Sequence, residues 1–196
     1  AVEMVFGRPG KVVVSGVGKS GHIARKMAAT LSSTGSPAFF IHPTDAAHGD
    51  LGMIEEADTA LLISNSGETT ELLVIIEYCK RFDIPIIGIS SVPGSTLMLA
   101  SDCELLLPKV PEACPIRLAP MSSTTMTLAL GDALAAALIR KRGFSSTDFG
   151  VFRCGRSVNP FAAQCSSILR AFFSSRSRSR IRQGVSISAK FIATSP

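Results

Sequence analysis

The sequence predicts an α/β fold built on a five-stranded parallel sheet. Short apolar runs, several of them β-branched, alternate along the chain with helical patterns, which is typical of βαβ units with right-handed crossovers. Polar stretches that contain glycine, serine or threonine follow several of these runs directly. Hydrophobic residues make up 46% of the 196 residues, with 16 Gly and no Trp. This composition suits strands that are buried on both faces.

Each strand is predicted from a short apolar run bounded by polar or turn residues. The five runs cover residues 12–14, 38–41, 59–63, 84–90 and 103–107. In a parallel sheet of this kind, ligands bind beyond the carboxyl ends of the strands. Polar loops at 15–22, 42–51 and 64–71 follow three of the strands, and we expect them to converge on one site.

Helices are predicted between the strands from their apolar spacing. We expect them at about residues 20–32 and 68–82, with a long one from the Ser/Thr run at 122–125 to about Arg140. Gly143 is placed to end this last helix. Residues 42–51 should form a polar loop or short helix. The first six residues should be the end of a helix that begins outside this sequence.

The formal net charge of +5 comes entirely from the end of the chain. Residues 153–196 contain eight Lys or Arg and no acidic residue, so the first 152 residues carry a net charge of −3. A nucleic-acid-binding function for the whole chain is therefore not supported. We expect residues 1–152 to form the folded domain, and residues 153–196 to form a basic, Ser/Arg-rich tail that is poorly ordered.

The cysteines and the apolar runs favour a cytoplasmic protein. The five cysteines are scattered and form no CxxC pair, which argues for reduced thiols rather than disulfides or a zinc knuckle. No apolar run reaches the length of a membrane-spanning helix, and the first residues lack the pattern of a signal peptide. We expect no membrane partner.

The stretch Ser64-Asn-Ser-Gly-Glu-Thr-Thr70 predicts a phosphate site. It follows an apolar strand, contains a glycine that lets a ligand approach the backbone, and should open a helix with carboxylates in its first turn. Free N–H groups at a helix start attract anions, and four hydroxyls surround them. Ser, Asn and Thr also cap helices without binding anything, but a second run of hydroxyls, Ser122–Thr125, opens another helix.

Two other phosphate-binding motifs partly match residues 13–21. The spacing Gly16-x-Gly18-x-x-Gly21 matches the dinucleotide fingerprint, but the following strand ends in Ile41-His42-Pro43, without the acidic residue that would bind a ribose. A P-loop requires glycine at position 13, where this chain has Val13. The P-loop is rejected and the dinucleotide site is disfavoured.

Single titratable residues give weaker signals. Lys19 could be a solvated lysine, and Glu112 could be a solvated loop carboxylate, although a loop before the last helix suits a catalytic base. His42 and His48 frame a loop but lack third and fourth ligands at metal-binding spacing. A structural zinc site is therefore not expected, and only an adventitious zinc ion at His42 is left open.

Five motifs in register resemble the sugar isomerase (SIS) domain of the arabinose 5-phosphate isomerase family. They are Gly18-Lys-Ser-Gly-His22, His48-Gly-Asp-Leu-Gly52, Ser64-Asn-Ser-Gly-Glu68, Glu112-Ala-Cys-Pro115 and Ala119-Pro-Met-Ser-Ser-Thr-Thr125. The resemblance covers about residues 5–152. It implies a three-layer, flavodoxin-like sandwich, a homotetramer without a required cofactor, and a role in Kdo and lipopolysaccharide synthesis.

The resemblance also implies roles for individual residues. The catalytic residues would be Lys19, His48, Glu71 and Glu112. The substrate-binding residues would be Gly18, Ser20, Gly35, Ser36, Ser64, Asn65, Ser66, Glu68, Thr69, Ser122, Ser123 and Thr124. Interconverting ribulose 5-phosphate and arabinose 5-phosphate moves a proton between C1 and C2 through a cis-enediolate. This chemistry needs a base (Glu112), a cation at the developing oxyanion (Lys19), and a group for ring opening or hydroxyl positioning (His48).

The chain departs from the family after Phe152. Where the family has a His-Pro-Gly-Gly element with a catalytic histidine, this sequence has Arg153-Cys-Gly-Arg156 and no regulatory CBS modules. A guanidinium cannot exchange protons near neutral pH, so we expect reduced or absent activity with binding retained. The tail suggests an out-of-frame or foreign C-terminus, with an RNA- or membrane-surface arm as the alternative. A non-catalytic sugar-phosphate sensor remains the second function class.

Overall fold

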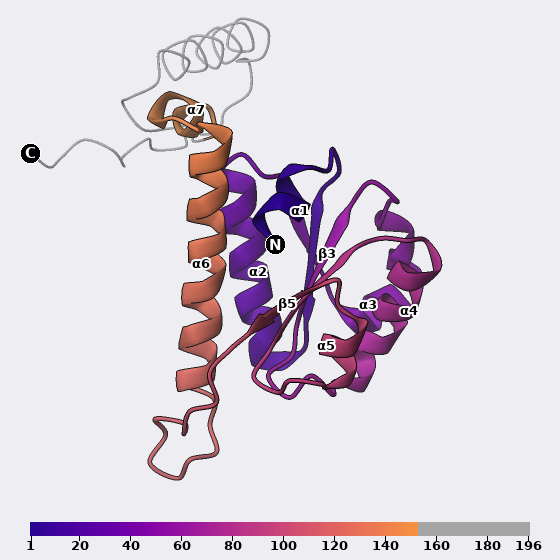
Figure 1. The fold of residues 1–196 in the computed structure, drawn as a ribbon, viewed down its shortest axis with the longest axis vertical. Helices are drawn as coiled ribbons and strands as arrows, with labels where there is room; N and C mark the ends of the chain where they lie inside the picture. Colours follow the sequence, from indigo (N-terminus) through magenta and orange to yellow (C-terminus); the bar gives the residue numbers. More distant parts are fainter. Residues whose placement is uncertain (153–196) are drawn as a thin grey trace, which may run out of the picture. The chain divides into compact units, whose positions relative to one another are not determined.

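The computed structural model describes residues 1–152, and residues 1–149 form one compact unit. A five-stranded sheet lies at its centre, with strands in the order β2-β1-β3-β4-β5 and every neighbouring pair parallel (Figure 1). The strands are β1 (Val12–Gly16), β2 (Ala38–Ile41), β3 (Thr59–Ile63), β4 (Ile86–Ser90) and β5 (Cys103–Leu106). This is the flavodoxin-like order, so the predicted parallel α/β sandwich is confirmed.

Alternating side chains of the central strands supply two separate cores. Val12 and Val14 pack into one core, whereas Val13 between them packs into the other. Leu61 and Leu62 of β3 divide in the same way, and every residue of β1, β3 and β4 is buried. Burial on both faces explains why these strands appear in the sequence as continuous apolar runs.

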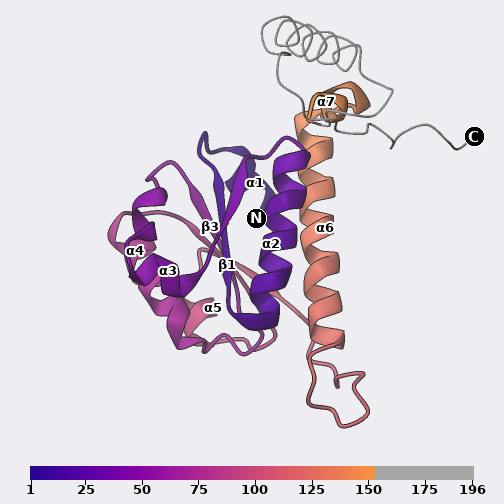
Figure 2. The same ribbon diagram turned by 180° about the vertical axis from the view of Figure 1, so that it is seen from behind.

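Helices cover both faces of the sheet. One core contains side chains from α1 (Val2–Phe6), α2 (Gly18–Ser33) and α6 (Ser122–Arg142). The other contains side chains from α3 (Pro43–Ala47), α4 (Leu73–Arg81) and α5 (Thr96–Ala100). Both views show α6 running alongside α2, with α3 and α4 across the sheet (Figures 1 and 2).

The long helix α6 is only partly covered. Its 21 residues are long and apolar enough to span a membrane by length and composition alone, and 33% of the apolar window is buried. The core helix of a soluble protein passes the same test. Leu134, Ala135 and Leu138 face the core, and Gly143 ends the helix with φ 63°, as predicted.

One helical prediction needs correction, and two short helices were not predicted. The helix predicted over 68–82 begins only at Leu73, after a short 3₁₀ turn at Thr70–Leu72, so α4 has no carboxylate in its first turn. Helices α5 and α7 (Ser146–Val151) were not predicted, because each covers fewer than two turns and shows no periodicity. The segment at 42–51 forms α3 and a 3₁₀ turn at Asp50–Met53, as expected. The predicted tail, 153–196, lies outside the described residues.

Truncating Leu138 should test how much α6 contributes to the fold. Its side chain is fully buried against the core, so Leu138→Ala should destabilise the protein by about 2–5 kcal/mol in urea unfolding. Leu99→Ala is the matched control, because Leu99 on α5 is 77% exposed and should cost less than about 0.5 kcal/mol. Equal effects of the two substitutions would contradict the described packing of α6.

Candidate functional site

The candidate site lies where the direction of strand order reverses. Chain connections run outward from β1 to β2 on one side and through β3 to β5 on the other. The loops after β1 and β3 therefore meet at the carboxyl edge of the sheet, where open α/β folds bind ligands. They carry the predicted residues Lys19, Ser20 and Asn65.

One pocket brings these loops together with the start of α6. Its volume is about 210 Å³, and its polar lining comes from Lys19 and Ser20 on α2, Asn65 after β3, and Ser123, Thr124 and Thr127 on α6. Pro120, Val17 and Ile23 complete it. Five of the predicted site residues are therefore in one pocket, although they lie up to about 100 positions apart in the chain.

The glycines that resembled a dinucleotide fingerprint serve the backbone instead. Gly18 has φ +59°, which lets the chain turn from β1 into α2. A Cβ atom on Gly21 would lie 2.7 Å from the Gly16 carbonyl oxygen, so the third glycine allows α2 to pack closely on β1. Strand β2 ends at Ile41 without an acidic residue, so the structure adds no ribose ligand to the disfavoured dinucleotide fingerprint.

The Ser64–Thr70 loop is a compact turn. Buried Ser64 bonds the Thr69 hydroxyl at 2.7 Å and accepts from the Gly67 N–H at 3.0 Å, while the Ser66 hydroxyl accepts from the Glu68 N–H at 3.2 Å. Gly67 has φ +73°. In the described part of the chain, the backbone N–H groups of Asn65, Ser66 and Thr69 have no acceptor. They are available to an anion.

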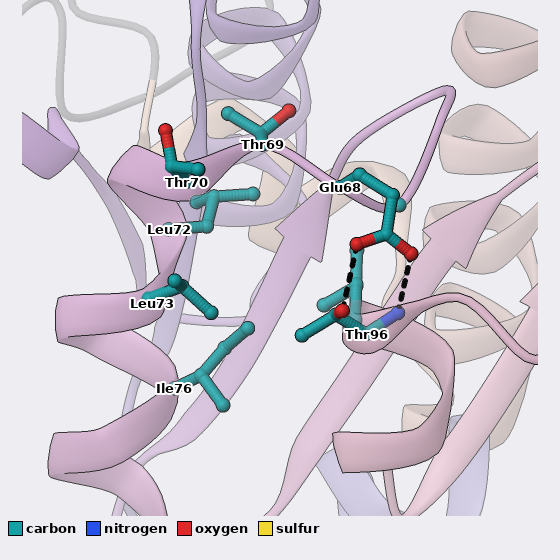
Figure 3. Close-up of a pocket in the computed structure, with 9 residues that line it drawn as sticks. Glu68, Thr69, Thr70, Leu72, Leu73, Ile76 and Thr96 are labelled. Carbon is teal, nitrogen blue, oxygen red and sulfur yellow. Dashed lines mark hydrogen bonds between the residues drawn. The ribbon is translucent and has the colours of Figure 1, made fainter.

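Glu68, which was predicted to contact the substrate, accepts hydrogen bonds from the start of α5, and its predicted substrate contact stays a prediction. Its carboxylate accepts from the Thr96 N–H at 2.9 Å and from the Thr96 hydroxyl at 2.7 Å, so it caps α5 (Figure 3). A second pocket, of about 60 Å³, lies beside this pair and is lined by residues 67–70 of the loop, by Leu72, Leu73 and Ile76, and by Thr96 and Leu97. The hydrogen bonds from Thr96 lower the pKa of Glu68. Glu68 thus anchors the loop and does not line the larger pocket.

Glu112 is held at the start of α6. Its Oε2 atom accepts from the backbone N–H groups of Met121 at 2.6 Å, Ser122 at 2.7 Å and Ser123 at 3.4 Å. The Ser123 hydroxyl and these N–H groups lower the pKa of Glu112, so the carboxylate is ionised at neutral pH. Because Ser123 also lines the larger pocket, Glu112 stands at its edge.

His48 and Glu71 lie in loops at the same edge of the sheet but do not line the pocket. His48 is exposed at the end of α3, and Glu71 is exposed in the 3₁₀ turn, where it accepts from Thr70 at 3.2 Å. His42 caps α3 by accepting from the Thr44 N–H at its Nδ1 atom, at 3.2 Å. Their predicted catalytic and metal roles stay predictions.

Gly35 and Ser36 are separated from the other predicted site residues. They precede β2 and therefore lie at the amino edge of the sheet. Ser36 is buried and its hydroxyl accepts from Arg142 Nε at 3.1 Å, while Gly35 lies beside the ring of Phe144. In a parallel sheet, a loop that precedes a strand opens away from the carboxyl edge. Within the described residues this pair is separated from the larger pocket, and its predicted substrate contacts stay predictions.

The described residues do not assemble a metal site. No group of three or more His, Cys, Asp or Glu side chains comes together within residues 1–152. Within these residues His42 has no partners that would complete a zinc ligand set, and its metal role stays a prediction. Arg153, at the position of the family's histidine, lies outside the described residues.

Part of the lining was not predicted from the sequence. Thr127 and Ile23 belong to none of the quoted motifs, and Pro120, inside the motif 119–125, was given no role, because their place in the pocket follows from the packing of α6 beside α2. Thr96, the partner of Glu68, was hidden in a helix too short to show periodicity. Thr127 could have been found one helical turn after Ser123.

Comparison with known proteins decides the family. The model of the SIS domain matches residues 6–137. The chain belongs to the SIS domain family. The solved structure of the c3406 protein from E. coli CFT073, in complex with arabinose 5-phosphate, superposes with a TM-score of 0.74 and 44% identity. The match covers 77% of this chain and 80% of that one.

Curated relatives carry the name arabinose 5-phosphate isomerase KdsD. The protein from Escherichia coli K12 is 53% identical over 158 residues, and that from Pseudomonas aeruginosa PAO1 is 50% identical over 158 residues. Each alignment covers 81% of this chain and 48% of the relative. The chain therefore spans about half the length of the curated relatives it matches.

Removing the Glu68 carboxylate should loosen the Ser64–Thr70 loop. Glu68→Ala is expected to speed backbone hydrogen exchange in residues 64–72 and 95–98 about fivefold or more, because the link to α5 is lost. The same effect should appear in the unchanged protein as pH falls through the lowered pKa of Glu68, since protonation removes an acceptor. Glu77→Ala, on the exposed face of α4, should leave this segment unchanged. Unchanged exchange in Glu68→Ala would refute the anchoring role.

Proposed function

We propose that this SIS domain binds a five-carbon sugar phosphate and derives from an aldose–ketose isomerase that interconverts D-ribulose 5-phosphate and D-arabinose 5-phosphate. One observation carries the proposal. Lys19, Asn65 and Thr124 line a single pocket, and the ionised Glu112 is held beside it by Ser123. The names of the curated relatives and the ligand of the similar structure support this substrate class.

The phosphate should bind in the Ser64–Thr69 loop. Three unpaired N–H groups and the hydroxyls of Ser66 and Thr69 offer donors that suit its charge and shape. Contacts at the phosphate hold the substrate while the reaction proceeds at the opposite end of the molecule. The charged Lys19 ammonium, Ser20 and Thr124 would then surround the hydroxyls near the reacting carbons.

The chemistry requires one mobile proton. Glu112 would take the C2 proton of the open-chain aldose and return it to C1, which gives the ketose. The Lys19 ammonium would stabilise the negative charge that develops on oxygen in the cis-enediolate. His48 would assist ring opening, and Glu71 would assist from the neighbouring turn. We propose that neither step requires a cofactor, and that the protein acts in the cytoplasm on the route to Kdo and lipopolysaccharide.

A non-catalytic sugar-phosphate sensor is the second candidate. Arg153 at the position of the family's catalytic histidine favours it, because a guanidinium cannot exchange protons near neutral pH. The retained Lys19 and Glu112 favour an enzyme lineage. Turnover separates these two functions, whereas binding does not.

Substrate binding and turnover should be measured on the full chain. We expect arabinose 5-phosphate to raise the melting temperature and NAD to leave it unchanged, with glucosamine 6-phosphate as the test of selectivity. Conversion of arabinose 5-phosphate in D₂O, followed by proton NMR, should be slow or absent compared with E. coli KdsD. Where turnover is measurable, Glu112→Gln should lower it by about 10²–10⁴-fold.

Glu104→Gln is the matched control for the base, because Glu104 is exposed on β5. Turnover that equals that of KdsD would contradict the effect assigned to Arg153. A melting temperature that no sugar phosphate changes would contradict the proposed ligand class.

We also propose that the domain forms a homotetramer through α6. The outward face of this helix presents small exposed residues, Ala129, Ala133 and Ala136, on an apolar segment of which 33% is buried. A second copy of the chain could bury this face, since small side chains let two helices approach closely. Figure 2 shows α6 on the outside of the α2 layer.

Replacing Ala133 by arginine should weaken this assembly. Ala133→Arg places a charge in the middle of the proposed interface, so light scattering should find dimers or monomers in place of tetramers. Ala47→Arg, on α3 across the sheet, is the matched control and should keep the tetramer. A wild-type monomer would contradict the proposal, and so would co-sedimentation of a monomer with lipid vesicles.

A further inference from the structure

Helix α6 begins without a cap of its own. Its N-cap residue Met121 makes no side-chain cap hydrogen bond, and no acidic residue lies in the first turn. The N–H groups at such a helix start need acceptors from elsewhere. Glu112 supplies one acceptor from nine residues upstream, since its Oε2 takes the N–H groups of Met121 and Ser122 at 2.6 and 2.7 Å.

Ser122 and Ser123, the first two residues of α6, contact the segment that contains Glu112. Ser122 Oγ accepts from the Ala113 N–H at 3.0 Å, which fixes the residue that follows Glu112. Ser123 is buried, with 7% exposed, and its backbone N–H donates to Glu112 Oε2 at 3.4 Å, while its hydroxyl is the largest cause of the lowered pKa of Glu112. The Ser122 hydroxyl is therefore occupied within the protein, and both serines hold the segment that carries Glu112.

The loop that joins Glu112 to α6 is closed by its own hydrogen bonds. The Cys114 carbonyl accepts from the Arg117 N–H at 2.7 Å, across a turn in which Arg117 has φ 56°. The buried Cys114 thiol accepts backbone hydrogen bonds, that from Ala119 foremost, and these lower its pKa. Residues 112–123 thus form one connected structure around the carboxylate.

We propose that Ser122 and Ser123 are positioning residues that hold Glu112 for proton transfer, and that they are not ligands of the substrate phosphate. The three backbone bonds end on Oε2, so Oε1 lies outside this backbone cap and is the atom that would accept the proton. The phosphate is left to the loop after β3, where N–H groups lack acceptors. The proposal rests on the proposed function only for the role of Glu112 as the base.

The charged side chains near Glu112 are not among the causes of its lowered pKa. Lys109 and Arg117 lie on the same loop as Glu112, and Lys19 of α2 lines the adjoining pocket. Within residues 1–152, none of the three forms an ion pair with Glu112. The pKa of Glu112 is lowered by hydrogen bonds, with the Ser123 hydroxyl as the largest cause.

Carbon-13 NMR of the full chain labelled at glutamate carboxyls tests the proposal directly. Ser123→Ala should raise the pH midpoint of the Glu112 titration by about one unit, because a donor to the ionised form is lost. Ser123→Thr should restore the midpoint by returning the hydroxyl. Thr125→Ala is the matched control, since the Thr125 hydroxyl donates only to the Met121 carbonyl, and it should change nothing.

Inorganic phosphate distinguishes positioning from ligand binding. Its Kd should stay within about twofold in Ser122→Ala and Ser123→Ala, and should rise about fivefold or more in Ser66→Ala. A titration midpoint unchanged in Ser123→Ala would overturn the proposal, as would weakened phosphate binding in both α6 variants. If no phosphosugar were turned over, the isomerase function would fail, while the titration would still decide the role of the serines.

Discussion

Loops at the carboxyl edge of a parallel sheet leave backbone N–H groups that neither strands nor helices can pair. In this molecule, side-chain oxygens accept hydrogen bonds from several of these N–H groups. Ser64 and Ser66 serve the turn after β3, Glu68 serves α5, and Glu112 serves α6. Buried or half-buried N–H groups without acceptors destabilise a fold. The few that remain unpaired mark where an external anion would be most stabilised.

The two carboxylates show how one interaction can have different consequences. Glu68 and Glu112 each accept hydrogen bonds at the start of a helix, and each has a lowered pKa for that reason. Glu68 is turned toward Thr96 and fixes a loop, whereas Glu112 stands beside the pocket that contains Lys19. Location relative to the pocket, and not the strength of the hydrogen bonding, separates an anchor from a candidate base.

The sequence was sufficient for the sheet but not for the details at its edge. The strands were predicted to within two residues, and β1, β3 and β4 are continuous apolar runs because both of their faces are buried. The start of α4 was placed five residues too early, since the hydroxyls after β3 bond one another in place of opening a helix. The motifs predicted that Lys19, Asn65 and Thr124 belong to one site, and the pocket contains all three. Some residue roles depend on a partner far away in the sequence and could not be predicted. Glu68 accepts from Thr96 and Ser36 accepts from Arg142, and neither donor has a local sequence pattern that would identify it.

The sheet also separates the molecule into two independent packing environments. Val12 and Val14 belong to the layer of α2 and α6, and Val13 belongs to the layer of α3 and α4, so the two layers share a backbone but no side chain. Substitutions in different layers should therefore add in their effects on stability. The exposed side of α6, which contributes to neither core, can therefore be substituted without repacking the sheet on which the loops of the pocket stand.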